Sequence, residues 1–189
     1  TYTDLVTAKQ SERQIAYQKI KNTFGSSNMV AVIVPSGDYE SEGRILDELD
    51  ACAEVKSTMG LTNIEAMDGY MLTDALTPRQ FSELTDLDYE VAELLYAAYA
   101  ADGGNYGKII GGLPKYSVPL IDMFTFLYGE MQDGYVSLDA DMTQTLEDAY
   151  SQITNAKKQL QSDDYSRMLV YLDLPVGGDE TYNFLDQIR

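Results

Sequence analysis

Residues Met29–Pro35, MVAVIVP, followed by the acidic run SGDYESEGRILDEL, decide the predicted fold. The apolar run has no polar alternation, which is typical of a central strand covered on both faces. Ser36-Gly37-Asp38 then breaks the strand, and the carboxylate of Asp38 can cap a helix over 39–52. We therefore predict a buried strand that leads directly into an amphipathic helix.

A second strand–helix unit stands near the end of the chain, where Arg167–Pro175, RMLVYLDLP, leads into VGGDETYNFLDQI. In both units a glycine stands two positions after the proline, at Gly37 and Gly177. Two such units, about 140 residues apart, predict a split ferredoxin-like βαβ–βα core. We expect its two most apolar strands, 29–34 and 167–174, to be parallel neighbours at the sheet centre, and the fourth strand to be absent from this chain.

The predicted fold class is α+β, with a large all-helical insertion between the two halves of the core. Residues 1–25 form a lead-in helix, 26–62 and 164–189 form the discontinuous core, and 63–163 form the insertion. Within the insertion, Thr77-Pro78 opens a long helix, because proline is tolerated in a first turn. Further helices are expected from Val118-Pro119 to about Gly134 and over 137–161.

Composition excludes several classes of function. The formal charge of −18 over 189 residues repels nucleic acid and anionic membrane surfaces. Histidine, the commonest general base and metal ligand, does not occur in the sequence, and the single cysteine, Cys52, rules out an internal disulfide. No apolar run approaches the roughly 20 residues of a membrane span. Because the chain opens on Thr1 and stops at Arg189 in a helical pattern, we expect a piece of a longer protein.

Two short motifs have a chemical and a structural interpretation. Gly177-Gly178-Asp179-Glu180 is similar to the signature loop of diguanylate cyclases, but a helical pattern follows it, which favours a turn with helix-capping acids. Asp139, Asp141 and Thr143 begin like a calcium loop, but Gln144 stands where that loop needs glycine. An acidic first helical turn is the simpler interpretation of these residues.

Two further groups have residue types suited to binding or catalysis. Gly107–Gly112 resembles a phosphate loop only in its glycines, because Lys108 comes too early and no strand precedes it. Asp86, Asp88, Glu90 and Glu93 place carboxylates on one predicted helix, where a pair could serve acid–base chemistry. Nothing in the sequence raises their pKa values, which favours a solvated acidic face.

The insertion is rich in tyrosine and methionine. Such side chains form surfaces that bind amphiphilic ligands or partner proteins, and they also fill the spaces between packed helices. Both interpretations remain open for the six tyrosines of the insertion that cluster in the sequence: Tyr89, Tyr96, Tyr99, Tyr106, Tyr116 and Tyr128.

Several segments, taken in order, resemble one family of membrane proteins, the MMPL-type exporters of the resistance–nodulation–division superfamily in their Gram-positive form. The resemblance covers nearly the whole chain. The segments that carry it are FGSSN at 24–28 with the following MVAVIVPSGDYE, LTPRQF at 76–81, YGK at 106–108, VPLIDMF at 118–124 and SRMLVYLDLP at 166–175.

This resemblance implies an extracytoplasmic porter domain with a ferredoxin-like core, attached to a cell membrane through the rest of the transporter. The family exports lipids, drugs or other amphiphiles at the expense of proton flow, through membrane helices that this chain does not include. The expected partners are that membrane-embedded remainder, a second subunit or a hydrophobic substrate, and no nucleic acid.

On this interpretation the domain is no enzyme, has no catalytic, metal or cofactor residue of its own, and its substrate-binding residues are unknown. A soluble or cell-surface adaptor that binds proteins through the insertion is the alternative. An acidic enzyme, such as a nucleotide cyclase or a metal hydrolase, is the third hypothesis.

Overall fold

The computed structural model describes residues 28–104, 106–109, 111–175 and 177–189. The described residues have a mixed α/β fold and form two compact units, the sheet unit (28–64 with 158–189) and the helical unit (65–157). The predicted lead-in helix, 1–25, lies outside the described residues.

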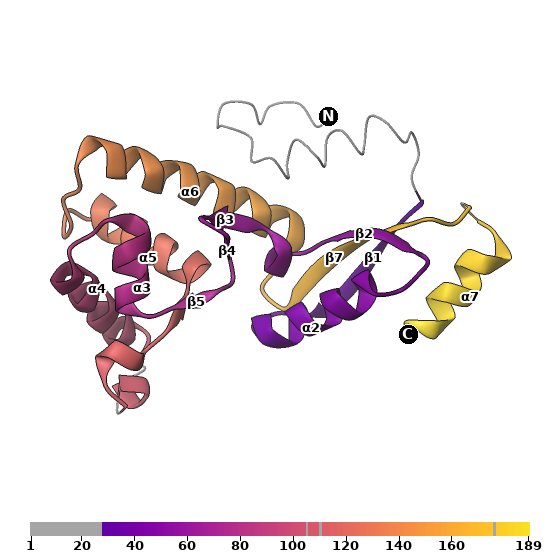
Figure 1. Ribbon diagram of the computed structural model, residues 1–189, viewed down its shortest axis with the longest axis horizontal. Coiled ribbons are helices and arrows are strands. Elements are labelled where there is room, and N and C mark those ends of the chain that lie inside the picture. The colour runs from indigo at the N-terminus through magenta and orange to yellow at the C-terminus, as the bar shows by residue number, and fades with distance from the viewer. Residues whose placement is uncertain (1–27, 105, 110, 176) are drawn as a thin grey trace. The chain divides into compact units, whose positions relative to one another are not determined.

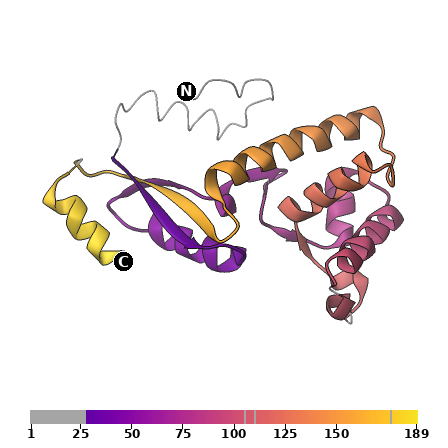
Figure 2. The same cartoon turned by 180° about the vertical axis from the view of Figure 1, so that it is seen from behind.

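The sheet unit contains three strands, β1 (Asn28–Pro35), β2 (Val55–Met59) and β7 (Tyr165–Leu172), in the order β1-β7-β2. Figures 1 and 2 show β7 between the other two strands from opposite sides. Its helices are α2 (Tyr39–Asp50), the short 3-10 turn η1 (Leu61–Asn63) and α7 (Asp179–Gln187). The strand–helix pairs β1–α2 and β7–α7 are the two units expected from the sequence.

The predicted parallel pairing of the first and last strands is wrong. β1 and β7 are neighbours, but they run antiparallel, with Val30 opposite Val170 and Val32 opposite Met168. β2 is also antiparallel to β7. The physical reason is the crossover through α2, which makes β1 and β2 parallel to each other and leaves a gap that β7 fills in the opposite direction.

The prediction that β1 is covered on both faces is also wrong. Burial alternates along this strand, and the side chains of Met29 and Ile33 are 50% and 56% exposed. β1 is the edge of the three-stranded sheet, while β7 at the centre is almost continuously buried. The apolar residues on both faces of β1 therefore made an edge strand resemble a central strand in the sequence.

One face of the sheet holds the core of this unit. Alternate residues of β1 and β7 point to it, and α2 and α7 contribute Leu46, Leu49 and Phe184. The expected cap of α2 is present, since the Ser41 N–H donates to Asp38 Oδ1 at 3.1 Å. α2 therefore covers this face of the sheet, and α7 contributes Phe184 to the same core.

The helical unit is less purely helical than predicted. Two small antiparallel ladders join β3 (Glu65–Met67) to β4 (Tyr70–Met71) and β5 (Ala75–Leu76) to β6 (Val118–Pro119). Its longer helices are α3 (Pro78–Thr85), α4 (Tyr89–Asp102), α5 (Leu120–Gln132) and α6 (Ala140–Leu160), whose last turn belongs to the sheet unit. Short 3-10 turns, η2 (Tyr106–Ile109) and η3 (Leu113–Lys115), connect α4 to β6.

The single helix expected after Thr77-Pro78 is two helices. The helix begins at Pro78 as predicted, and Thr77 caps it in a reciprocal capping box with Gln80. Asp86 then adopts the left-handed conformation, with φ at +58°, and ends α3. The hydroxyl of Ser82 donates to the Leu87 carbonyl at 2.6 Å, which holds the chain in the turn before α4.

Aromatic packing forms the centre of the helical unit. The ring of Phe81 lies against those of Tyr96 and Phe124, with centroid distances of 5.9 and 5.6 Å. All three side chains are at most 1% exposed. Burial of large aromatic surfaces stabilises this unit, and it fixes which face of α4 points inward.

Candidate functional site

The motifs that had a chemical interpretation have structural roles. Gly177 has φ at +75°, Gly178 is the N-cap residue of α7, and Asp179 and Glu180 occupy its first turn. The favourable interaction of these acids with the helix dipole explains their position. The cyclase-like sequence therefore forms a helix start, and no hairpin of the kind that cyclases place there.

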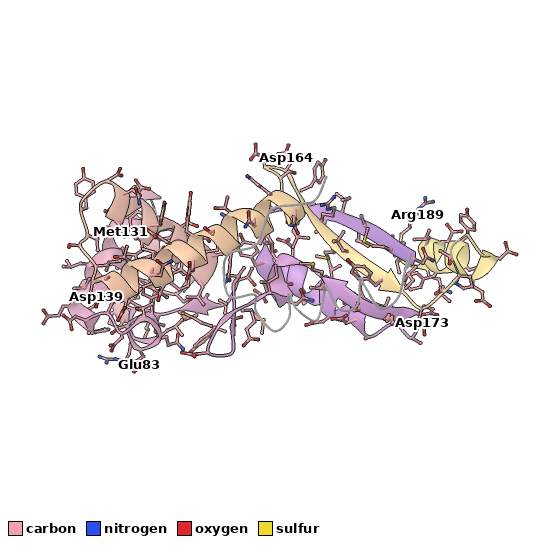
Figure 3. The ribbon with its side chains drawn as sticks, turned by 90° about the horizontal axis from the view of Figure 1, so that it is seen from above. Glu83, Met131, Asp139, Asp164, Asp173 and Arg189 are labelled. Carbon is pink, nitrogen blue, oxygen red and sulfur yellow. The ribbon has the colours of Figure 1, made fainter. Side chains whose placement is uncertain are left out.

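The calcium-like residues also begin a helix. The Met142 N–H donates to Asp139 Oδ1 at 2.7 Å, and the Thr143 N–H donates to the Asp139 carbonyl at 2.9 Å. Asp139 is labelled at the start of α6 in Figure 3. Within the described ranges, no three acidic or cysteine side chains lie together in a way that could hold a metal ion.

The glycine-rich connection 107–112 does not have the form of a phosphate loop. Its first part belongs to the 3-10 turn η2, which follows helix α4, and Gly112 has φ at +99°. A phosphate loop instead follows a strand and leads into a helix N-terminus. Ile110 lies outside the described residues.

The four carboxylates expected on one helix are divided between a turn and α4. Asp86 and Asp88 lie in the turn that separates α3 from α4, and Glu90 and Glu93 lie on α4. Glu93 accepts a hydrogen bond from the Tyr89 hydroxyl, which raises the pKa of that tyrosine. This arrangement is an acidic helix start and contains no pair of facing carboxyls.

The tyrosines of the insertion are largely part of its packing. The buried Tyr96 hydroxyl donates to the Leu76 carbonyl at 2.8 Å. The ring of Tyr116 packs edge-on against the ring of Tyr96, with the ring centroids 6.2 Å apart. Tyr99 packs edge-on against Phe126. Tyr128 on α5 stacks on Tyr150 of α6 with ring centroids 3.8 Å apart. These contacts support the helix-packing interpretation for the tyrosines whose side chains are described.

A buried polar pair in the sheet unit was not predicted from the sequence. Glu42, in the first turn of α2, is 3% exposed, and Ser166 on β7 is 2% exposed. Burial raises the pKa of the Glu42 carboxyl, and the nearby charge of Asp38 adds to the rise, while hydrogen bonding toward Ser166 opposes it. Glu42 Oε2 and Ser166 Oγ nevertheless have no hydrogen-bond partner of good geometry.

The spacing of Glu42 to Leu46 and Leu49 could have predicted the burial of Glu42. Positions four and seven residues apart share one helix face, and these leucines face the core. A carboxyl on that stripe is therefore predicted to be buried.

A second carboxyl with a raised pKa lies in the helical unit. Burial raises the pKa of Asp122 on α5, and the charge of Lys157 opposes that rise. The Asp122 charge in turn adds to the effect of burial in raising the pKa of Tyr116. The acidic neighbour of Glu42 is Asp38, which caps α2 by accepting a hydrogen bond from the Ser41 N–H.

The outer edge of β1 is the feature of the sheet unit best suited to association. Among the described strands, β1 pairs only with β7, so its other edge carries unpaired backbone groups. The eight residues of the strand, NMVAVIVP, include no charge. Natural proteins usually protect such edges by charges, or cover them with another strand or a helix, so this edge is the candidate site for a further strand.

Cys52, the single cysteine, follows α2 and packs at the border of the core. Its thiol donates to the Glu48 carbonyl at 3.4 Å. The contact explains its place in the fold without any role as a nucleophile.

Comparisons with models of known protein families, with curated proteins and with solved structures found no match. In the part of the chain that the structure describes, no helix combines the length and the hydropathy needed to cross a membrane.

Proposed function

We propose that this chain is a non-catalytic extracytoplasmic domain of a proton-driven membrane exporter, with a role in guiding an amphiphilic substrate or in contacting neighbouring domains. The observation that supports the proposal best is the order of the sheet, in which the late strand β7 lies between β1 and β2. An antiparallel third strand between two parallel strands is the arrangement of a ferredoxin-like core. The resemblance of the sequence to MMPL-type exporters implies the same type of core.

The position of α7 supports a ferredoxin-like core with four strands. Crossovers between parallel strands are almost always right-handed. In the crossover β1–α2–β2, α2 packs on the covered face of the sheet, and Phe184 of α7 packs into the core on that same face. Because β7 runs antiparallel to β1, a right-handed crossover through α7 moves across the sheet in the direction from β7 to β1 and beyond it. A strand that followed α7 would therefore pair with the outer edge of β1.

The two strand–helix pairs support this proposal independently. β1–α2 and β7–α7 are antiparallel neighbours whose helices share one face. The halves of a ferredoxin-like core are likewise two antiparallel strand–helix pairs. The glycines two positions after Pro35 and Pro175 both have positive φ, +105° at Gly37 and +75° at Gly177.

The first test concerns the parent protein and its topology. We expect hydrophobic spans of about 20 residues on both sides of this segment in the parent gene. In intact cells expressing the parent, Tyr182→Cys in a Cys52→Ser background should react with a membrane-impermeant maleimide, because Tyr182 is 60% exposed. A parent without such spans, or labelling that requires permeabilised cells, would refute the proposal.

A protein-binding module is the second candidate function. The observation that favours it is an uncovered apolar face on α4, where Leu94 is 71% exposed. A binding role for this face is compatible with either type of parent protein.

A further inference from the structure

The outer face of α4 carries an apolar stripe. Val91, Leu94, Ala98 and Ala101 follow one another at spacings of three, four and three residues, so they lie along one side of the helix. All four are exposed, Val91 by 37% and Leu94 by 71%. We call these four residues the α4 stripe.

The α4 stripe is not needed to hold α4 in place. The opposite side of the helix supplies the contacts with the unit, through the buried Ala92, Leu95, Tyr96 and Ala100. A helix that is apolar on all sides is normally buried on all sides. The outer face of α4 therefore has the composition of an interface.

The shape of the α4 stripe suits a second helix. Its spacing of three and four residues is that of a helix–helix seam. Ala98 and Ala101 have small side chains, which allow the backbone of another helix to approach closely. Leu94 projects beside them and can insert between side chains of the partner.

The charges that α4 itself places beside the stripe are of one sign. Glu90 flanks one side and Asp102 the other, and α4 contains no lysine or arginine. The guanidinium of Arg79 on α3 lies 4.1 Å from the ring centroid of Tyr89, on the side of α4 away from the stripe. The borders of the stripe are therefore acidic.

We propose that the α4 stripe binds a cationic amphipathic helix of a partner polypeptide. Apolar residues of the partner would cover Leu94 and Val91, and lysines or arginines beside them would face Glu90 and Asp102. A second copy of this chain fits poorly, because its own acidic borders would meet the same carboxylates. The inference does not depend on the exporter proposal.

The test is a titration of the full chain into a fluorescein-labelled model helix of about 15 residues, with leucines at the seam positions and lysines elsewhere. We expect saturable binding in fluorescence anisotropy, weakened as sodium chloride is raised. Leu94→Gln should weaken it about tenfold, because one apolar anchor is lost. Tyr135→Gln, at a 78% exposed aromatic outside α4, is the matched control and should bind like the wild type.

Four outcomes would overturn the proposal. They are absence of binding, equal binding by Leu94→Gln, equal binding of a peptide with glutamates in place of the lysines, and a dimer in light scattering that Leu94→Gln dissociates. The second would show attraction by diffuse negative charge alone, and the fourth would identify a second copy as the occupant. Circular dichroism of Leu94→Gln checks that the exposed substitution leaves the fold intact.

Discussion

Glu42→Met should stabilise the protein at neutral pH. In the wild type, the Glu42 carboxyl is 3% exposed and Oε2 lacks a hydrogen-bond partner. Leaving a buried polar group unsatisfied costs about 1–3 kcal/mol. Methionine has a similar length and helix propensity, so it fills the same space without that cost.

Two effects determine the net magnitude. The wild-type carboxylate in the first turn of α2 interacts favourably with the helix dipole, by about 0.3–1 kcal/mol. Subtracting this loss leaves an expected gain of about 1–2 kcal/mol in the free energy of unfolding for Glu42→Met. Glu40→Met is the matched control, because Glu40 is in the same turn but exposed and should lose only the dipole interaction.

The gain should depend on pH. Burial raises the folded-state pKa of Glu42 above its ordinary value. The stability associated with the protonated carboxyl is therefore complete below the unfolded pKa and is lost as the pH rises through the folded pKa. The difference between Glu42→Met and the wild type should thus be small near pH 4 and larger near pH 7.

Urea denaturation followed by far-ultraviolet circular dichroism at these two pH values measures the difference. Carboxyls that do not interact with Glu42 contribute equally to both proteins, so the subtraction isolates Glu42 and its interaction with Asp38. A variant less stable than the wild type at neutral pH, or a difference independent of pH, would refute the reasoning. Either result would mean that the native carboxylate is well paired.

Three further substitutions test the packing described above. Tyr96→Phe should lower the free energy of unfolding by about 1–2 kcal/mol, because it removes the buried donor to the Leu76 carbonyl; an unchanged urea midpoint would show that water can replace this hydroxyl. Asp86→Ala should cost about 1 kcal/mol, since alanine tolerates the left-handed conformation less well, whereas Asp86→Gly should not. Ser166→Ala should raise the thermal midpoint of the wild type, because an unpartnered buried hydroxyl is removed; a lowered midpoint would reveal a hydrogen bond to Glu42.

Local elements were predictable from the sequence because their signals lie within a few residues of one another. The capping carboxylate of Asp38, the Thr77-Pro78 helix start and the glycines after Pro175 act through the first or last turn of a single element. Each of them begins or ends an element at the predicted place. The two strand–helix pairs and the helical character of the middle of the chain followed from the same local patterns.

The break between α3 and α4 shows where local reasoning failed. The apolar spacing from Phe81 to Ala98 is compatible with one helix, and an aspartate in the left-handed conformation has no strong sequence signal. Packing of Phe81 against Tyr96 and Phe124 requires α3 and α4 to change direction at Asp86. The break therefore follows from contacts between residues far apart in the chain.

The sequence by itself determined most of the longer helices and the strands of the sheet unit, the absence of histidine and the strongly acidic character. The tertiary structure decided the direction of β7, the edge position of β1, the burial of Glu42 and the exposure of Leu94. The physical reason is that the sequence pattern of an apolar residue is the same whether its side chain packs against a helix, lies on an edge strand or is exposed to water. Which neighbour covers each face is decided only by contacts between residues far apart in the chain, such as the pairing of β7 with both β1 and β2.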